Sequence, residues 1–181
     1  MNEPPLPETT RLRLLPLGAE HLRALMDGRS QFEALIGFAA ASGLGDHLHS
    51  DEVSPAWREA LRSATGRDPW RHGFGMLYRD DATVVGTVGF KGPPDDEGAV
   101  EISYGVRPDY ENRGITTEGA GAAVQWAFSN PGVQSVIAHT LPSNIASQRV
   151  LQKNGFLLLG EVVDPEDGLV LRWQRLRSPQ D

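Results

Sequence analysis

The chain has 181 residues, of which 39% are hydrophobic and 23% charged, as expected for one folded domain with a sizeable core. Its formal net charge of −7 argues against a nucleic-acid partner, and the absence of cysteine excludes disulfides and thiolate chemistry. No secretion signal and no apolar run of the roughly 18 residues that a membrane span needs is found, so we expect no membrane partner and a cytoplasmic location.

The first half predicts a mobile, proline-rich tail over residues 1–9, then a single domain over residues 10–177. Apolar and alternating runs predict strands at 11–17, 70–78, 83–90 and 99–106, and helices at 18–27, at 31–36 and from Pro55. Residues 37–54 show no clear hydrophobic periodicity, so no element is predicted there. Because short polar turns join the last three strands, they should form an antiparallel meander.

The second half alternates helices with strands. Helices are expected at 116–129 and 143–154, and strands at 133–139, 156–163 and 169–175. A strand, helix, strand order requires a parallel crossover. The fold class is therefore α/β (α+β), a mixed, mostly antiparallel, twisted sheet of about seven strands with helices on both faces.

Residues 106–120 form the most informative stretch. An apolar strand stops at Pro108, a polar turn ends at Gly114, and a helix rich in small residues follows. The free N–H groups and the dipole at such a helix start can bind an anion, and glycine lets the ligand approach closely. The alternative, an ordinary capped helix after a turn, stays open.

Two polar positions are candidates for chemistry. Glu101 lies in an apolar strand, where a carboxylate is costly unless it has a partner or a function. It is a candidate general base, or else the partner of an arginine that stabilises the strand. Asn144 and Ser147 lie three residues apart on one helix face, although Asn144 also suits an N-cap.

Five stretches together resemble a known family: TRLRL (10–14), VGTVGF (85–90), VEISYGV (100–106), the turn and helix from Pro108 onward, and PSNIASQRVLQKNGF (142–156). They resemble the GCN5-related N-acetyltransferase (GNAT) superfamily, in its RimJ/RimL-type branch that acetylates ribosomal-protein N-termini. The resemblance covers about residues 9–175.

The resemblance implies acetyl-coenzyme A (acetyl-CoA) as co-substrate, no metal, and a primary amine as acceptor, either a protein N-terminus or a small molecule. It implies direct attack in a ternary complex, an N-acetyltransferase domain over residues 10–177, a parallel splayed strand pair from Tyr104 onward and, by analogy, a homodimer. Glu101 would take the amine proton and Ser147 would assist departure of the thiolate. The residues implied to bind the cofactor are Tyr104, Gly105, Val106, Asn112, Arg113, Gly114, Ile115, Thr116, Thr117, Asn144 and Ser147.

The chain also departs from the family pattern. The phosphate loop of the family begins with Arg or Gln and ends with Gly or Ala, where this chain has Glu111 and Thr116. The tyrosine acid of many members is replaced by Leu151, which fits the branch that has a serine at position 147. His139, at the end of a strand near the expected cleft, is a further candidate site residue. The alternative function is a non-catalytic GNAT-fold binding protein with a degenerate pyrophosphate loop.

Overall fold

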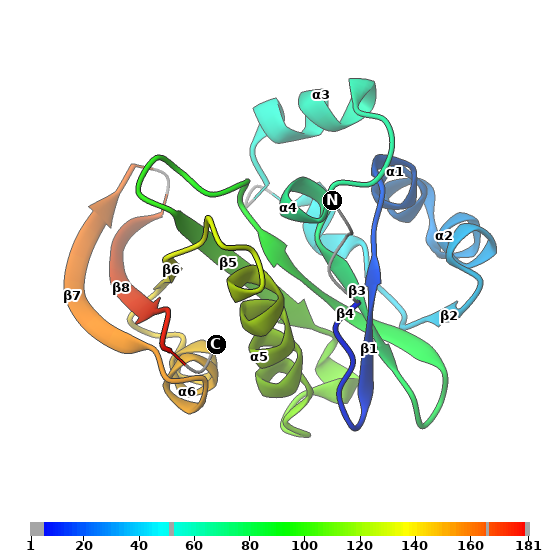
Figure 1. Ribbon diagram of the computed structural model, residues 1–181. Coiled ribbons are helices and arrows are strands. Elements are labelled where there is room, and N and C mark those ends of the chain that lie inside the picture. Colours follow the sequence, from blue (N-terminus) through cyan, green and yellow to red (C-terminus); the bar gives the residue numbers. More distant parts are fainter. Residues whose placement is uncertain (1–5, 51–52, 166, 180–181) are drawn as a thin grey trace.

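The computed structural model describes residues 6–50, 53–165 and 167–179. Within them, eight strands form one sheet in the order β1-β3-β4-β5-β6-β8-β7, with the short β2 beside β4 (Figure 1). The pairs β5–β6 and β2–β4 are parallel and the others antiparallel, which confirms the predicted mixed sheet. The strands are β1 (Leu12–Pro16), β2 (Ala39–Ala40), β3 (Phe74–Tyr78), β4 (Thr83–Phe90), β5 (Ala99–Val106), β6 (Ser135–Thr140), β7 (Leu157–Asp164) and β8 (Gly168–Leu176).

Helices cover both faces of the sheet, as predicted. The α-helices are α1 (Ala19–Asp27), α2 (Arg29–Ile36), α3 (Pro55–Ser63), α4 (Pro69–His72), α5 (Ile115–Phe128) and α6 (Ile145–Lys153), and the 3₁₀ helices are η1 (Asp46–His49) and η2 (Pro108–Tyr110). Helices α5 and α6 lie together on one face, and α1, α2 and α3 lie toward the other (Figure 1).

Neighbouring strand residues divide between two hydrophobic cores. Leu14 and Val85 belong to the core under α5, whereas the adjacent Leu15 and Val84 belong to the core under α1 and α2. This division follows from the period of two in a strand, which sends successive side chains to opposite faces. Burial on both faces explains why β1, β3 and β4 are nearly continuous apolar runs.

One predicted strand begins later than expected. Residues 70–78 were predicted as one strand, but Pro69–His72 form the short helix α4 and the strand starts at Phe74. The Asp68 side chain caps this helix by accepting a hydrogen bond from Trp70 N at 3.0 Å, and proline suits the first helical position. The Trp70 ring then packs against Trp126, with 4.6 Å between ring centroids.

The predicted N-terminal tail lies partly outside the described residues, because residues 1–5 are not among them. Of the rest, Pro7 O accepts a hydrogen bond from Leu14 N at 3.0 Å, and Glu8 pairs with Arg79 at 2.9 Å. Residues 7–9 thus contact the sheet, while the domain bounds of 10–177 stay a prediction. Among the described helices, none has the length and apolar character that crossing a bilayer requires.

Gly86 in β4 is expected to tolerate no side chain. A Cβ there would stand 2.9 Å from Val106 Cα and would also clash with Gly105 O and Met76 Cε. Gly86→Ala should therefore destabilise the fold by about 1–3 kcal/mol through overpacking. Urea unfolding measures this loss. Gly105→Ala is the control, since its Cβ meets nothing within 4 Å; equal midpoints for the two variants would contradict the expected clash.

Candidate active site

Strands β5 and β6 separate in the middle of the sheet. Their ladder pairs three residues of each strand and ends at Glu101 opposite Ile137, although β5 continues to Val106. This confirms the splayed parallel pair, and it corrects its start: the strands part at Ile102, two residues before the predicted Tyr104.

Beyond this point the backbone of β5 has one free edge. The hydrogen bond from Lys91 N to Glu101 O, 2.9 Å, shows that the odd-numbered residues of β5 bond to β4. By the alternation of an antiparallel ladder, the N–H and C=O groups of Tyr104 and Val106 point into the gap, together with those of residue 102. The backbone groups of Gly105 are turned toward β4 instead. The gap can therefore pair with the amides of an extended ligand.

The start of α5 is open as well. Gly114 is its N-cap in the left-handed region, with φ 76°, and contributes no side-chain cap. Among the described residues, none accepts a hydrogen bond from the backbone N–H groups of residues 112–117. Glu111 is exposed and Thr116 half-buried. A helix start with free N–H groups of this kind can bind an anion, and the phosphate loop stays a prediction.

The side chains of this loop differ in what they offer. The Arg113 guanidinium lies over the Tyr110 ring, 5.0 Å from its centroid, and Arg113 O accepts a hydrogen bond from Arg11 Nη1 at 2.7 Å. Ile115 is buried in the core under α5, so only its backbone can reach a ligand. Asn112 and the hydroxyl of Thr117 remain available on the partly exposed side of the loop.

Glu118, in the first turn of α5, ties this helix to the N-terminal strand. Its carboxylate accepts hydrogen bonds from the Thr9 hydroxyl, from Arg11 N at 2.9 Å and from Arg11 Nε at 2.7 Å. Burial by itself raises the pKa of Glu118, but these hydrogen bonds and the charge of Arg11 outweigh it and lower the pKa below its ordinary value. The contact places Arg11 beside the predicted phosphate loop.

The lowered pKa of Glu118 predicts a pH dependence of folding stability. A carboxyl whose pKa is depressed in the folded state stabilises it fully above the unfolded value, about 4.3, and less as the pH falls below that value toward the folded one. Glu118→Gln should therefore flatten the loss of stability on acidification below about pH 5. Urea midpoints measured from pH 7 to 3 test this, with Glu59→Gln of an exposed ion pair as control. Parallel curves for wild type and Glu118→Gln would refute it.

Glu101 is the centre of a three-residue polar cluster. Its Oε1 lies 2.7 Å from Lys91 Nζ and 3.0 Å from His139 Nδ1, and only a fifth of its side chain is exposed. The alternative role predicted for Glu101 was to pair with an arginine; its partners are instead a lysine and a histidine. An ionised carboxylate only accepts hydrogen bonds, so Nδ1 of His139 carries a hydrogen and faces Glu101. In the neutral ring, Nε2 is then free to accept a proton.

Ser147 faces a phenol across the splay. Its Oγ lies 3.0 Å from the hydroxyl oxygen of Tyr104, which also lies 3.3 Å from Ser147 O. Burial raises the pKa of Tyr104 to about 12, more than the hydrogen bond to Ser147 lowers it. The phenol is therefore protonated near neutral pH and orients the Ser147 hydroxyl.

Asn144 is the N-cap of α6, as one of its two predicted roles required. Its Oδ1 accepts a hydrogen bond from Ser147 N at 3.0 Å. Helix α6 consequently begins at Ile145, two residues later than predicted. Asn144 still lines the same cavity as Ser147, so capping does not prevent a contact with a ligand.

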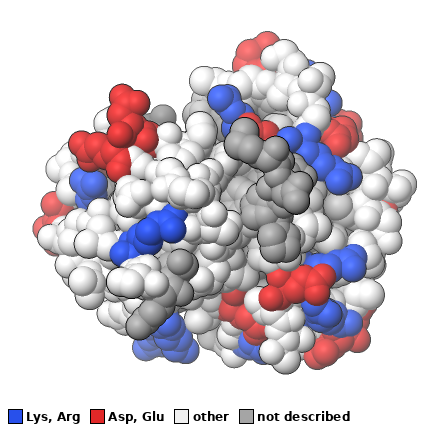
Figure 2. Space-filling model, in the orientation of Figure 1, with Lys and Arg blue, Asp and Glu red and all other residues white. Residues whose placement is uncertain are grey.

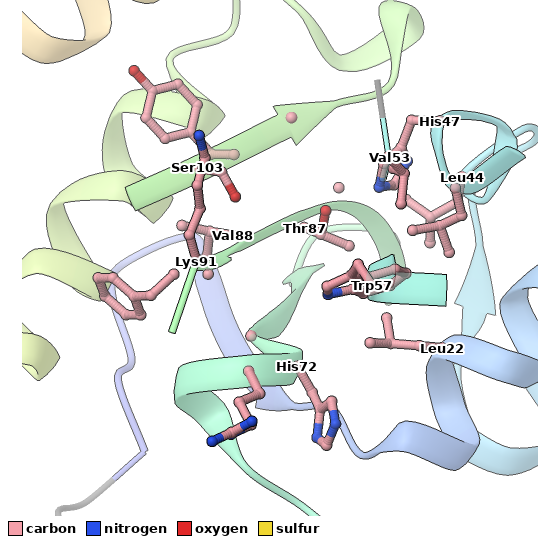
Figure 3. A pocket seen from close by; sticks show the side chains of 18 of the residues that line it. Leu22, Leu44, His47, Val53, Trp57, His72, Thr87, Val88, Lys91 and Ser103 are labelled. Atoms are coloured by element: carbon pink, nitrogen blue, oxygen red, sulfur yellow. The ribbon is translucent and has the colours of Figure 1, made fainter. Parts of the chain in front are cut away.

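Two connected hollows meet at the splay. The smaller, about 180 Å³, is lined by Glu101, His139, Tyr104, Asn144 and Ser147, and therefore reaches both edges of the gap. The larger, about 620 Å³, lies between η1, α3 and α4 on one side and β4 and β5 on the other. Figure 3 shows Lys91 and Ser103 at one end of this cleft and Leu44, Val53 and Trp57 at the other.

Both hollows share Lys91, Ser103, Tyr104 and Asp167. The two hollows therefore adjoin at the splay. The sequence analysis missed Lys91, which follows β4 directly, and Arg107, which follows β5. A cation at the end of a core strand was the available signal for both.

The comparisons with known proteins agree with this geometry. The family model described as "Acetyltransferase (GNAT) domain" matches residues 11–157. The protein named "Uncharacterized N-acetyltransferase YjdG" from Bacillus subtilis is 31% identical over 156 residues, covering 83% of this chain and 89% of that protein. The chain therefore belongs to the GNAT acetyltransferase family, and it is an acyl-CoA-dependent acetyltransferase.

Solved structures show the same fold. A GNAT-family acetyltransferase from Bacillus anthracis matches with TM-score 0.64 and 18% identity over 94% of this chain and 98% of that one. RimL, the ribosomal L7/L12 alpha-N-protein acetyltransferase, solved in complex with coenzyme A, matches with TM-score 0.64 and 18% identity over 94% and 97%. The expected co-substrate is accordingly acetyl-CoA, and the described residues hold no cluster of side chains suited to a metal ion.

Proposed function

We propose that this enzyme transfers an acetyl group from acetyl-CoA to a primary amine by direct attack in a ternary complex. One observation carries the proposal: a single hollow at the splay is lined by the Glu101–His139 pair on β5 and β6 and by Ser147 on α6. Such an arrangement brings a proton acceptor and a hydroxyl donor to one reaction centre, and holding both substrates there supplies rate by proximity.

The residues present fit the co-substrate, whose thioester supplies an activated acetyl group. The free N–H groups of residues 112–117 and the guanidinium of Arg113 would hold the pyrophosphate. The open backbone edge at Tyr104 and Val106 would pair with the pantetheine amides, and the Asn144 amide would steady the same arm. Glu111 is exposed, so its carboxylate can stay in water while the backbone N–H groups bind the anion.

An amine is protonated near neutral pH and must lose a proton before it can attack. The Lys91 ammonium partly neutralises the Glu101 carboxylate, so we assign uptake of the amine proton to Nε2 of His139. Glu101 then fixes the ring and stabilises the imidazolium that forms, as in other carboxylate–histidine pairs. The charged groups that line the hollow with them are Lys91 and Asp167.

Departure of the thiol requires little acid catalysis. A thiol has a pKa of about 8.5, well below the value of about 12 for Tyr104, so the phenol is a poor proton donor to the thiolate. Ser147, held by Tyr104, would instead donate a hydrogen bond to the leaving sulfur. Backbone N–H groups at the splay would stabilise negative charge on the thioester oxygen.

Calorimetric titration with acetyl-CoA, followed by an assay of free-thiol release over a panel of amines, tests the proposal. We expect saturable binding and amine-dependent thiol release. Binding without release for any amine would favour the alternative, a non-catalytic GNAT-fold binding protein. Absence of both heat and a melting shift at millimolar acetyl-CoA would reject the proposed donor site as well.

The homodimer expected by analogy stays a proposal. Apolar side chains are exposed along the edge strand β7, including Leu157, Leu159 and Val163, and the last of these is 80% exposed. Such a surface is a candidate for association between copies. Sedimentation analysis of the wild type beside Leu159→Lys tests this proposal. A wild-type protein that stays monomeric at all concentrations would rule out the dimer.

A further inference from the structure

The large cleft carries more positive than negative side chains, although the chain is acidic overall. Arg71, Lys91 and Arg107 line it, and Asp167 is the one carboxylate among its described lining residues. Figure 2 shows acidic side chains gathered over the β4–β5 loop and the β7–β8 tip. The acids of that loop, residues 95–97, do not line the cleft. Among the described lining residues, an acceptor inside the cleft therefore meets three cationic side chains and one carboxylate.

Arg107 is the least compensated of these cations. The nearest carboxylate to its guanidinium among the described residues is that of Asp46, which is 3.8 Å away and largely exposed. Its Nε is buried and has no hydrogen-bond partner there. The other two cations each have a closer carboxylate: Lys91 that of Glu101 at 2.7 Å, and Arg71 that of Asp68 at 3.2 Å. A buried guanidinium N–H without an acceptor is costly, and Arg13 Nε is the other such atom among the described residues; of the two arginines, Arg107 is the one that lines the large cleft.

The guanidinium is also fixed in place. A Cβ at Gly43 would stand 2.6 Å from Arg107 Nη2 and 2.9 Å from its Cζ, so the group packs against the backbone of this glycine. About 70% of the Arg107 side chain is withdrawn from solvent. A planar, preorganised fork of this kind suits a carboxylate.

The spacing along β5 sets the size of the ligand. Ser103, which lines the splay, and Arg107 are four residues apart, or about 13 Å along a strand. An α-amino acid is too short to place its amine at the splay and its own carboxylate at Arg107. A peptide in extended form spans about 10 Å over three residues.

We propose that the acceptor is an amine bearing a carboxylate about 10–13 Å away, and that Arg107 binds this carboxylate. A peptide N-terminus with an acidic side chain at its third residue meets both requirements. Polyamines and aminoglycosides do not meet them, because all of their charged groups are positive. This inference rests on the proposed function, because it concerns the acceptor side of the same site.

Three C-terminally amidated tripeptides test the proposal: Ser-Ala-Asp, its isosteric Ser-Ala-Asn, and Ser-Ala-Arg. Each has one primary amine. We expect kcat/KM to be about 10–100-fold higher for the Asp peptide than for the Asn peptide, and lowest for the Arg peptide. Spermidine and kanamycin serve as cationic acceptors and should react no better than the Arg peptide.

Arg107→Met should abolish the difference between the Asp and Asn peptides, because the Asp peptide loses its partner for the carboxylate. Arg107→Lys keeps the charge but loses the planar guanidinium, so it should retain part of the preference for the Asp peptide. This variant distinguishes loss of carboxylate binding from a folding defect. Arg71→Met is the matched control at another cation of the cleft and should keep the preference. A preference that survives Arg107→Met, or faster reaction of spermidine or kanamycin, would overturn the inference.

Binding separates this inference from the proposed function. The same peptides are titrated into the protein saturated with coenzyme A. Tighter binding of the Asp peptide that depends on Arg107 supports the inference even without turnover, whereas equal binding of the Asp and Asn peptides rejects it. Failure of the transfer reaction alone counts only against the proposed function.

Discussion

His139→Asn is expected to lower kcat by about 10²–10⁴-fold, the usual contribution of a general base. The asparagine amide can still donate a hydrogen bond to Glu101 but offers no basic nitrogen. The acid limb of the kcat/KM profile, which reports the essential base of the free enzyme, should be lost in this variant. Steady-state kinetics from pH 5 to 9 measure both effects.

Glu101→Gln should lower kcat by a similar factor. The imidazole of His139 then loses the carboxylate that orients it and stabilises its charged form. The double variant should be scarcely slower than either single variant, since the two residues act as a unit. Lys91→Met is the companion change; it removes the ammonium beside Glu101 but leaves the His139 contact. Unchanged pH profiles in His139→Asn and Glu101→Gln would rule out the proposed role of both residues in general-base catalysis.

Gly114→Val is expected to raise KM for acetyl-CoA by about 10–100-fold with a much smaller change in kcat. The substitution strains a backbone with φ 76° and places a branched side chain at the start of α5, where the pyrophosphate would lie. Losing one hydrogen bond to a charged ligand costs about 1.5–3 kcal/mol, which corresponds to roughly the 10–100-fold range.

Gly37→Val provides the matched control. Gly37 has nearly the same conformation, φ 77° and ψ 16°, and a Cβ there would meet nothing within 4 Å, whereas a Cβ at Gly114 would meet only Arg11 Nη2, at 3.3 Å. It lies at the end of α2, away from the proposed site. Both variants should lose similar stability, but only Gly114→Val should lose affinity for acetyl-CoA. An equal KM in the two variants would contradict the assignment of the phosphate loop.

Features coded within a short stretch could be predicted from the sequence. The strand, turn and glycine before α5, and the spacing of Asn144 and Ser147, are local patterns that leave few alternatives. The N-cap of α4 at Asp68, followed by Pro69, was a local signal too, but the strand predicted over residues 70–78 took no account of it. Local patterns fix element type better than element ends.

Contacts between distant segments could not be predicted. Glu101 meets Lys91 and His139 only because β4, β5 and β6 lie side by side in the sheet, which no local pattern encodes. The unpaired Arg107 Nε depends likewise on the packing of the chain around Gly43. The pattern thus indicated Glu101 as a candidate base, whereas the assignment to His139 needed the fold.

A crystal structure of the protein with coenzyme A tests the central claim most directly. The account predicts pyrophosphate oxygens within hydrogen-bond distance of the backbone N–H groups of residues 113–117, and the thiol between Ser147 and the Glu101–His139 pair. Coenzyme A bound elsewhere, or a helix start covered by the side chains of Glu111 and Thr116 with no ligand density, would contradict it.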